Sequence, residues 1–110
     1  MDIAYKILTQ AEVTSLRNGT FAGAPVDQTD GYIHLSTAAQ LDETLNRHFA
    51  GQEDLFIAAV PLAPLGAALR WETSRGGDLF PHYYGTLEIR HISACIKLAR
   101  DENGRARLPG

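Results

Sequence analysis

The chain is organised around the stretch GYIHLSTAAQ, residues 31–40. Its first five residues predict a strand, because tyrosine, isoleucine and leucine favour extended backbone and alternation lets His34 point away from an apolar face. The rest predicts a helix start, because Thr37 is followed three residues later by Gln40, the spacing of a capping box. A histidine at a strand end, followed by Ser36 and a helix N-terminus, favours a site for a polar or anionic ligand. The alternative is a structural histidine beside an ordinary cap.

On the N-terminal side of this stretch, residues 2–8 predict an opening strand. Alternation places Lys6 on the less apolar of its two faces. Thr9 and Glu12 form a second capping box, which predicts a short helix directly after the strand. Residues 20–30 are rich in Gly, Ala, Pro and Asp and predict a loop with at most one short strand.

On the C-terminal side, the apolar spacing predicts a helix over residues 37–49. The apolar run 55–60 predicts a central strand buried on both faces. A further strand is expected at residues 69–73, with Trp71 facing the core. Residues 79–85 carry too much Gly, Pro and aromatic character for a helix and predict an ordered loop.

Two closing strands are predicted at residues 86–89 and 92–99, before a hairpin turn at Asn103-Gly104. Strands dominate and two helices come early, and this order favours an α+β domain over a regularly alternating parallel fold. We expect the 110 residues to form one domain.

The composition is that of an ordinary globular protein, with 45% hydrophobic and 21% charged residues. A net charge of −3 without a cluster of Lys or Arg argues against a dedicated nucleic-acid binder, although an enzyme acting on a nucleotide or an RNA end stays possible. The sole cysteine, Cys95, lies among apolar residues and predicts a buried thiol with no intrachain disulfide. No apolar run approaches the ~20 residues of a membrane span, and no signal-peptide layout is visible, so we expect a cytoplasmic protein.

Standard catalytic motifs are absent: there is no glycine-rich dinucleotide fingerprint, P-loop, HExxH or GxSxG. The four histidines are too scattered to indicate a metal site. Glu72 lies on a partly buried strand, so its carboxylate needs a partner, for which an arginine on the same strand or in the next loop is available. A surface ion pair is the alternative. His82 and Tyr84 lie in the aromatic segment, as part of the core or of a binding surface.

Three motifs together carry a family resemblance: residues 31–37, Arg70-Trp71-Glu72, and FPHYYG at residues 80–85. They resemble the bacterial domain-of-unknown-function family numbered 952 over about residues 3–96. Tyr83 stands where that family commonly has leucine. Members of the family are similar to the ADP-ribosyltransferase fold, which RNA 2′-phosphotransferases also use. The resemblance implies a mixed, mainly antiparallel, split sheet whose cleft binds NAD.

The resemblance also implies roles for single residues, although the histidine or arginine typical of the first strand has no counterpart here. Glu72 is the candidate acid that stabilises positive charge on a ribose. His34 and His82 complete the candidate catalytic set. The candidate ligand contacts are Lys6, Tyr32, Ser36, Arg75, Phe80 and Tyr84, and no metal ligand is expected.

Three functions stay open at this point. The first is an ADP-ribosyl or phosphate transferase acting on NAD or a nucleotide-linked substrate, and it predicts ligand binding that depends on Glu72 and His34. The second is a module that binds a nucleotide or another small molecule without turnover. The third is a domain with a vestigial cleft that associates with proteins through an exposed apolar patch. The oligomeric state is not predicted.

Overall fold

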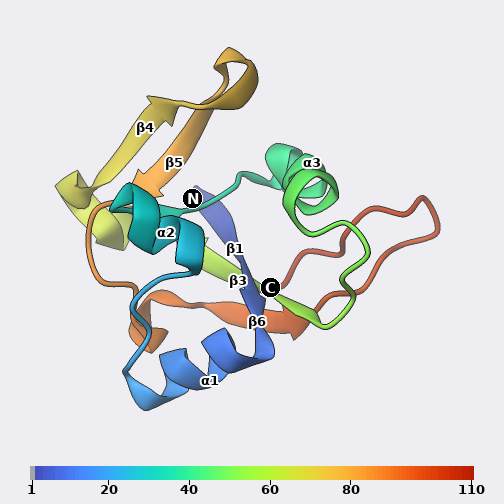
Figure 1. Cartoon of the computed structure of the whole chain (residues 1–110), viewed down its shortest axis with the longest axis horizontal. Coiled ribbons are helices and arrows are strands. Elements are labelled where there is room, and N and C mark those ends of the chain that lie inside the picture. Colours follow the sequence, from blue (N-terminus) through green and yellow to red (C-terminus); the bar gives the residue numbers. More distant parts are fainter. Residues whose placement is uncertain (1) are drawn as a thin grey trace.

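Two three-stranded sheets form the framework of the fold (Figure 1). The computed structural model describes residues 2–110, except the side chain of Arg75. The first sheet has the order β1-β3-β6 and the second β2-β5-β4, and every pairing between the described strands is antiparallel. The strands are β1 (Ile3–Thr9), β2 (Ile33–His34), β3 (Leu55–Pro61), β4 (Leu69–Thr73), β5 (Leu79–Tyr83) and β6 (Ala94–Lys97).

Three α-helices precede the second half of the chain: α1 (Gln10–Asn18), α2 (Pro25–Asp30) and α3 (Ala38–His48). Short 3-10 turns are η1 (Ala63–Ala68), η2 (Arg75–Gly77) and η3 (Ile89–His91). Both predicted capping boxes are confirmed. The Glu12 amide donates to Thr9 Oγ1 at 3.2 Å, and the Gln40 amide donates to Thr37 Oγ1 at 3.2 Å. Each cap satisfies an amide that a helix start leaves without a partner in the helix.

The core lies on both faces of the first sheet. On one face, α1 packs Val13 and Leu16 against the alanine and leucine side chains of β1. On the other face, α3 packs Leu41 and Leu45 against Tyr5 and its neighbours. The central position and double burial predicted for residues 55–60 are therefore confirmed.

The stretch at residues 31–40 connects the two sheets. In the second sheet, His34 pairs with His82. Two residues later, Ser36 exchanges both backbone hydrogen bonds with Tyr5 of β1, at 2.7 and 2.9 Å. Residues 34–36 therefore carry the chain from the second sheet to the first, and the cap Thr37 and the helix α3 follow directly.

The loop predicted at residues 20–30 is correct for residues 20–24 and wrong for residues 25–30, where the structure has the helix α2. Pro25 stands at its first turn, where a missing N–H costs nothing. The side chain of Asp27 accepts a hydrogen bond from the Ala24 amide at 2.8 Å, which caps the same end. As a result, three α-helices occur early rather than two. The sheets are antiparallel rather than mixed.

The aromatic segment also differs from its prediction. Residues 79–83 form the strand β5, in the middle of the second sheet, rather than a loop. No strand forms at residues 86–89, where extended chain leads into η3. Trp71 is 44% exposed rather than buried in the core, and Cys95 is exposed rather than buried. No helix in the described part of the chain is long and apolar enough to cross a membrane.

We expect the Gly85→Ala variant to lose about 1–3 kcal/mol of unfolding free energy, because the new methyl group overpacks the core. An ideal Cβ at Gly85 would lie 2.5 Å from the Tyr83 hydroxyl and 2.6 Å from its ring carbon Cζ. Tyr83 is buried and has little room to move. Urea unfolding of this variant beside Thr86→Ala, an exposed neighbour, checks the expectation, and equal midpoints would contradict it.

Candidate functional site

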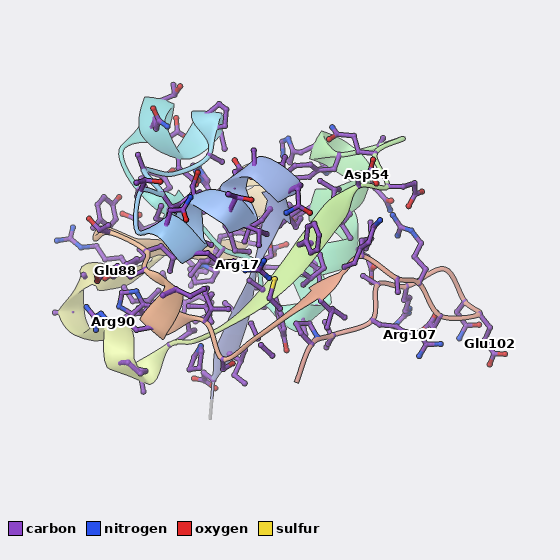
Figure 2. All side chains as sticks on the ribbon, turned by 90° about the horizontal axis from the view of Figure 1, so that it is seen from below. Arg17, Asp54, Glu88, Arg90, Glu102 and Arg107 are labelled. Carbon is purple, nitrogen blue, oxygen red and sulfur yellow. The ribbon has the colours of Figure 1, made fainter. Side chains whose placement is uncertain are left out.

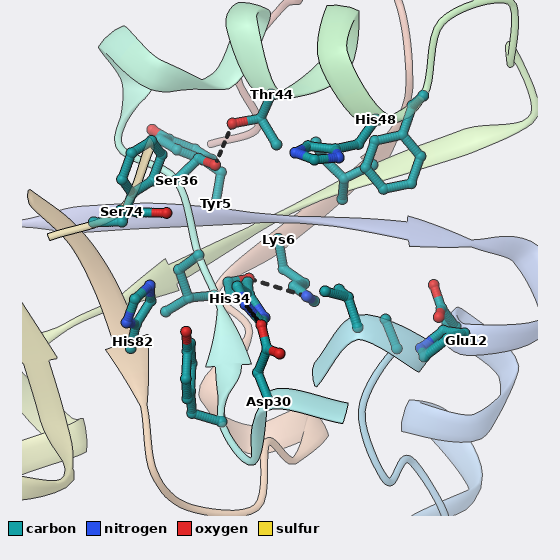
Figure 3. A pocket seen from close by; sticks show the side chains of 18 of the residues that line it. Tyr5, Lys6, Glu12, Asp30, His34, Ser36, Thr44, His48, Ser74 and His82 are labelled. Carbon is teal, nitrogen blue, oxygen red and sulfur yellow. Dashed lines mark hydrogen bonds and ion pairs between the residues drawn. The ribbon is translucent and has the colours of Figure 1, made fainter. Parts of the chain in front are cut away.

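A cavity of about 550 Å³ lies along the edge of β1 opposite β3, where the two sheets meet (Figure 3). In this view β1 crosses the cavity. Ser36, Thr44 and His48 lie on the α3 side of it, and Lys6, His34 and His82 lie on the α2 side. The volume falls within the roughly 300–1,000 Å³ typical of small-molecule sites.

The α2 side of the cavity contains a buried charge cluster around Asp27. Lys6 Nζ lies 2.9 Å from Asp27 Oδ2 and also donates to the His34 carbonyl oxygen at 3.0 Å. Burial by itself would raise the pKa of Asp27, but hydrogen bonds from His34 and the charge of Lys6 outweigh it and lower the pKa to about 2. Lys6 alternates with Tyr5 and Ile7 as predicted, but its own face of β1, shared with Ala4 and Leu8, is buried as well, so Lys6 is buried and paired.

His34 lies between two carboxylates. Its Nδ1 is 2.7 Å from Asp27 Oδ1, and its Nε2 is 2.9 Å from Asp30 Oδ2. The imidazole lines the cavity between these contacts. His34 belongs to the two-residue strand β2, which follows α2 closely in the chain. Both carboxylates that contact it come from α2.

His82 is held by a second carboxylate. Its Nδ1 lies 2.8 Å from Glu72 Oε1, and the same oxygen accepts a hydrogen bond from the Tyr84 hydroxyl at 2.7 Å. Hydrogen bonds from His82 and then Tyr84 lower the pKa of Glu72. The bond to Glu72 in turn raises the pKa of Tyr84. A carboxylate on Nδ1 favours the tautomer whose Nε2 carries a lone pair, which is the arrangement of a general base.

Aromatic rings join the two histidines. Tyr32 stacks on His82 with ring centroids 4.1 Å apart, and it lies 4.5 Å from His34 and 5.2 Å from Tyr84. Burial, with the charge of Asp30, raises the pKa of Tyr32, so this phenol stays protonated at neutral pH. A flat π surface therefore faces the cavity beside two polarised imidazoles.

Most of the predicted site residues line this one cavity: Lys6, Tyr32, His34, Ser36, Phe80 and His82. Glu72 and Tyr84 do not line it: Glu72 contacts His82, and Tyr84 contacts Glu72 and the Tyr32 ring. Among the described side chains, His82 and Tyr84 are the hydrogen-bond partners of Glu72, and Arg70, one of the two arginines available on sequence grounds, lies over the Tyr84 ring at 5.0 Å. The predicted role of Arg75 concerns a side chain outside the described part of the structure.

The sequence prediction missed Asp27, Asp30, Thr44 and His48. Asp27 and Asp30 lie in the segment taken for a loop, although Pro25 followed by an acid two residues later is a helix-start signal. Thr44 forms a 3.0 Å hydrogen bond with the Ser36 hydroxyl. Among the described residues, no group of three or more His, Cys, Asp or Glu side chains is placed to hold a metal ion.

Fold and site together define an α+β protein with two linked antiparallel sheets and a histidine–carboxylate cluster at their junction. The chain belongs to the family described as Protein of unknown function (DUF952), whose sequence profile matches residues 7–95. No curated protein matches it significantly.

Solved structures of one relative resemble the chain closely. A crystal structure of protein CC0527 from Caulobacter crescentus has 40% sequence identity and a TM-score of 0.85, over 96% of this chain and 93% of the other. A solution NMR structure of CC0527 has 41% identity and a TM-score of 0.81, over 97% and 93% of the two chains. The shared fold extends over nearly the whole chain.

Proposed function

We propose that the chain is a small ADP-ribosyltransferase-like enzyme that binds NAD, or a related nucleotide-linked substrate, in the cavity beside β1. The observation that carries this proposal is the pair of carboxylate-bound imidazoles, His34 and His82, which line one cavity and both pack against the Tyr32 ring. The split-sheet architecture and the family resemblance agree with such a fold, but chemistry is argued from the site alone.

The charges around the cavity suggest how NAD lies in it. Lys6 is the one lysine or arginine among the described lining side chains, and Asp27 already neutralises it. The cavity lining therefore offers the diphosphate of NAD no uncompensated positive charge among the described side chains. The positively charged nicotinamide ring suits Tyr32 and the nearby carboxylate of Asp30 better. We infer that nicotinamide enters first and that the diphosphate stays toward solvent.

The transfer itself needs few groups. The bond between nicotinamide and the ribose C1′ breaks, nicotinamide leaves with the electron pair, and positive charge develops on the ribose. An acceptor oxygen or nitrogen then bonds to C1′ and gives its proton to His82 Nε2. Glu72 holds His82 from behind and stabilises the imidazolium that forms. It therefore acts as a positioning residue in this proposal.

NAD should raise the melting temperature of the protein by several degrees, because a ligand at ~100 times its Kd adds about 2.7 kcal/mol of stability. Differential scanning fluorimetry with NAD, ADP-ribose and nicotinamide measures this. The Tyr32→Leu variant should bind NAD about tenfold more weakly, because it loses the aromatic face. Trp71→Leu is the matched control, since it removes an exposed ring outside the cavity. An unchanged melting temperature of the wild type in the presence of NAD would refute the proposal.

One observation favours a second function, a binding module without turnover. The carboxylate of Glu72 does not line the cavity, and both His82 and Tyr84 already occupy the same oxygen of it. An acid in that position does not contact the ribose directly. This function predicts that NAD or ADP-ribose raises the melting temperature while no nicotinamide is released. The nicotinamide-release assay therefore distinguishes a binding module from an enzyme.

A further inference from the structure

The helix α2 forms one wall of the cavity but is poorly anchored in the core. Between the buried Phe21 and Ile33, Asp27 is the one buried residue. The helix is bounded by Gly23 and Gly31, whose φ angles of 102° and 86° lie in the left-handed region. Figure 2 shows the segment standing at the margin of the molecule. A helix held without apolar side chains opens at a small free-energy cost.

Polar contacts hold α2 to the rest of the protein, and among the described residues they reach two partners. Lys6 and His34 both contact Asp27, and His34 also contacts Asp30. The His34 amide adds a further hydrogen bond to Asp27 Oδ1 at 3.0 Å. The other side-chain hydrogen bonds of the segment stay within it, from Gln28 to Gly23, from Thr29 to Pro25 and from the Ala24 amide to Asp27. We call these contacts of Lys6 and His34 with Asp27 and Asp30 the latch.

The latch requires a doubly protonated imidazole. Carboxylates accept hydrogen bonds and do not donate them, and a neutral histidine carries one N–H. His34 makes contacts of 2.7 and 2.9 Å with two carboxylates, so both ring nitrogens must donate. Once the ring is neutral, its lone pair and the facing carboxylate repel each other. The remaining N–H of the ring continues to donate to the buried Asp27, and the exposed Asp30 loses its hydrogen bond.

We propose that α2 is a pH-dependent gate of the cavity, closed while His34 carries both ring protons and released at its C-terminal end when one proton is lost. The Lys6–Asp27 pair stays intact above acidic pH and acts as the pivot. Ala24, Pro25 and Val26 of the gate line the cavity, so its release widens the way in. Control of ligand entry rests on the function proposed above, whereas the pH-dependent opening does not.

Several charged or titratable groups face His34 from the surrounding elements. They are Asp27 and Asp30 of α2, Lys6 of β1, Tyr32 on the same stretch, and His82 of β5 with Glu72 behind it. His82 lies 5.5 Å from His34 between ring centroids, so it belongs to the same cluster. A test of the gate must therefore change the latch and leave His82 in place.

Hydrogen–deuterium exchange of the α2 amides tests the gate in the absence of ligand. In the wild type, the protection factors of these amides should be about tenfold or more lower at about pH 8.5 than at about pH 5.5, because loss of one ring proton removes the contact between His34 and Asp30. In Asp30→Asn they should not depend on pH, because an amide can accept from the N–H or donate to the lone pair. Asp54→Asn, an exposed acid far from α2, should behave as the wild type.

Two results would overturn the gate: pH-independent protection in the wild type, or unchanged pH dependence in Asp30→Asn, which would assign the titration to another group. Stopped-flow association of NAD adds a functional measurement. Its association rate should rise with pH in the wild type and stay level in Asp30→Asn. If NAD does not bind at all, the proposed substrate fails while the exchange experiment still decides whether the gate exists.

Discussion

We expect the Asp27→Asn variant to lose about 3–5 kcal/mol of unfolding free energy, the largest single loss among the charged side chains. Lys6 is 5% exposed and Asp27 is 3% exposed, and their charged atoms lie 2.9 Å apart. Asparagine keeps the size of the side chain but leaves the Lys6 ammonium buried without a counter-charge. It also weakens the bond to His34. Chemical denaturation followed by circular dichroism measures the loss.

The control is the same substitution in an exposed pair. Asp54 lies 3.6 Å from Lys97, and both side chains are largely in water, so Asp54→Asn should cost about 0–1 kcal/mol. Adding Lys6→Met to Asp27→Asn should recover part of the loss, because it removes the uncompensated charge. A loss below about 1 kcal/mol in Asp27→Asn would contradict the buried pair.

The same pair gives the protein an acid-dependent stability. The pKa of Asp27 is about 2 in the folded protein against an ordinary 3.8, so the folded state favours the ionised carboxylate. This contribution of about 2 kcal/mol is fully present above about pH 4 and is lost as the pH falls toward 2. Asp27→Asn should therefore flatten the decline of stability between these values, compared with the wild type.

Elements governed by neighbouring residues could be predicted from the sequence. The caps at Thr9 and Thr37 satisfy amides three residues away, and both helices begin where the caps indicate. The strand at residues 55–60 is apolar without interruption, because it is covered on both faces. In each case the interactions that decide the structure lie within a few residues, so the pattern of the chain contains them.

Elements decided by distant contacts could not be predicted. Asp27 meets Lys6 across 21 residues, and neither position carries a local signal for the other. Residues 79–83 were expected to be loop, yet they form β5, in which Pro81 lies opposite Trp71 and its carbonyl oxygen accepts from the Leu35 amide at 3.1 Å. Trp71 was assigned to the core from the alternation of faces along residues 69–73. Whether an element covers that side of β4 depends on the fold as a whole.

The candidate site falls between these cases. The motifs indicated His34 and His82 separately, and the pairing of β2 with β5 places them opposite each other in one cavity. Glu72 follows the same logic, since residues 72 and 82 project to the same face of neighbouring strands. The motifs did not indicate that Glu72 contacts His82 and that His82, rather than Glu72, lines the cavity.

The second large effect concerns turnover. If the proposed transfer is correct, the His82→Gln variant should release nicotinamide from NAD about 10²–10⁴ times more slowly than the wild type, because glutamine cannot take the acceptor's proton. Nicotinamide release with water as acceptor can be followed by chromatography. Trp71→Leu is the control, because its ring lies outside the cavity and it carries no group that the transfer uses.

Glu72→Gln distinguishes a positioning role from a purely structural one. The glutamine oxygen can still accept from His82 Nδ1, so the ring keeps its orientation and NAD keeps its affinity. The negative charge that stabilises the imidazolium is gone, so His82 stays unprotonated to lower pH. The acidic limb of the rate profile should accordingly move to lower pH, with a smaller loss of rate than in His82→Gln. An unshifted limb with a full loss of rate would place Glu72 on the ribose instead. Wild-type protein that binds NAD but releases no nicotinamide would leave the binding module as the function of this cavity.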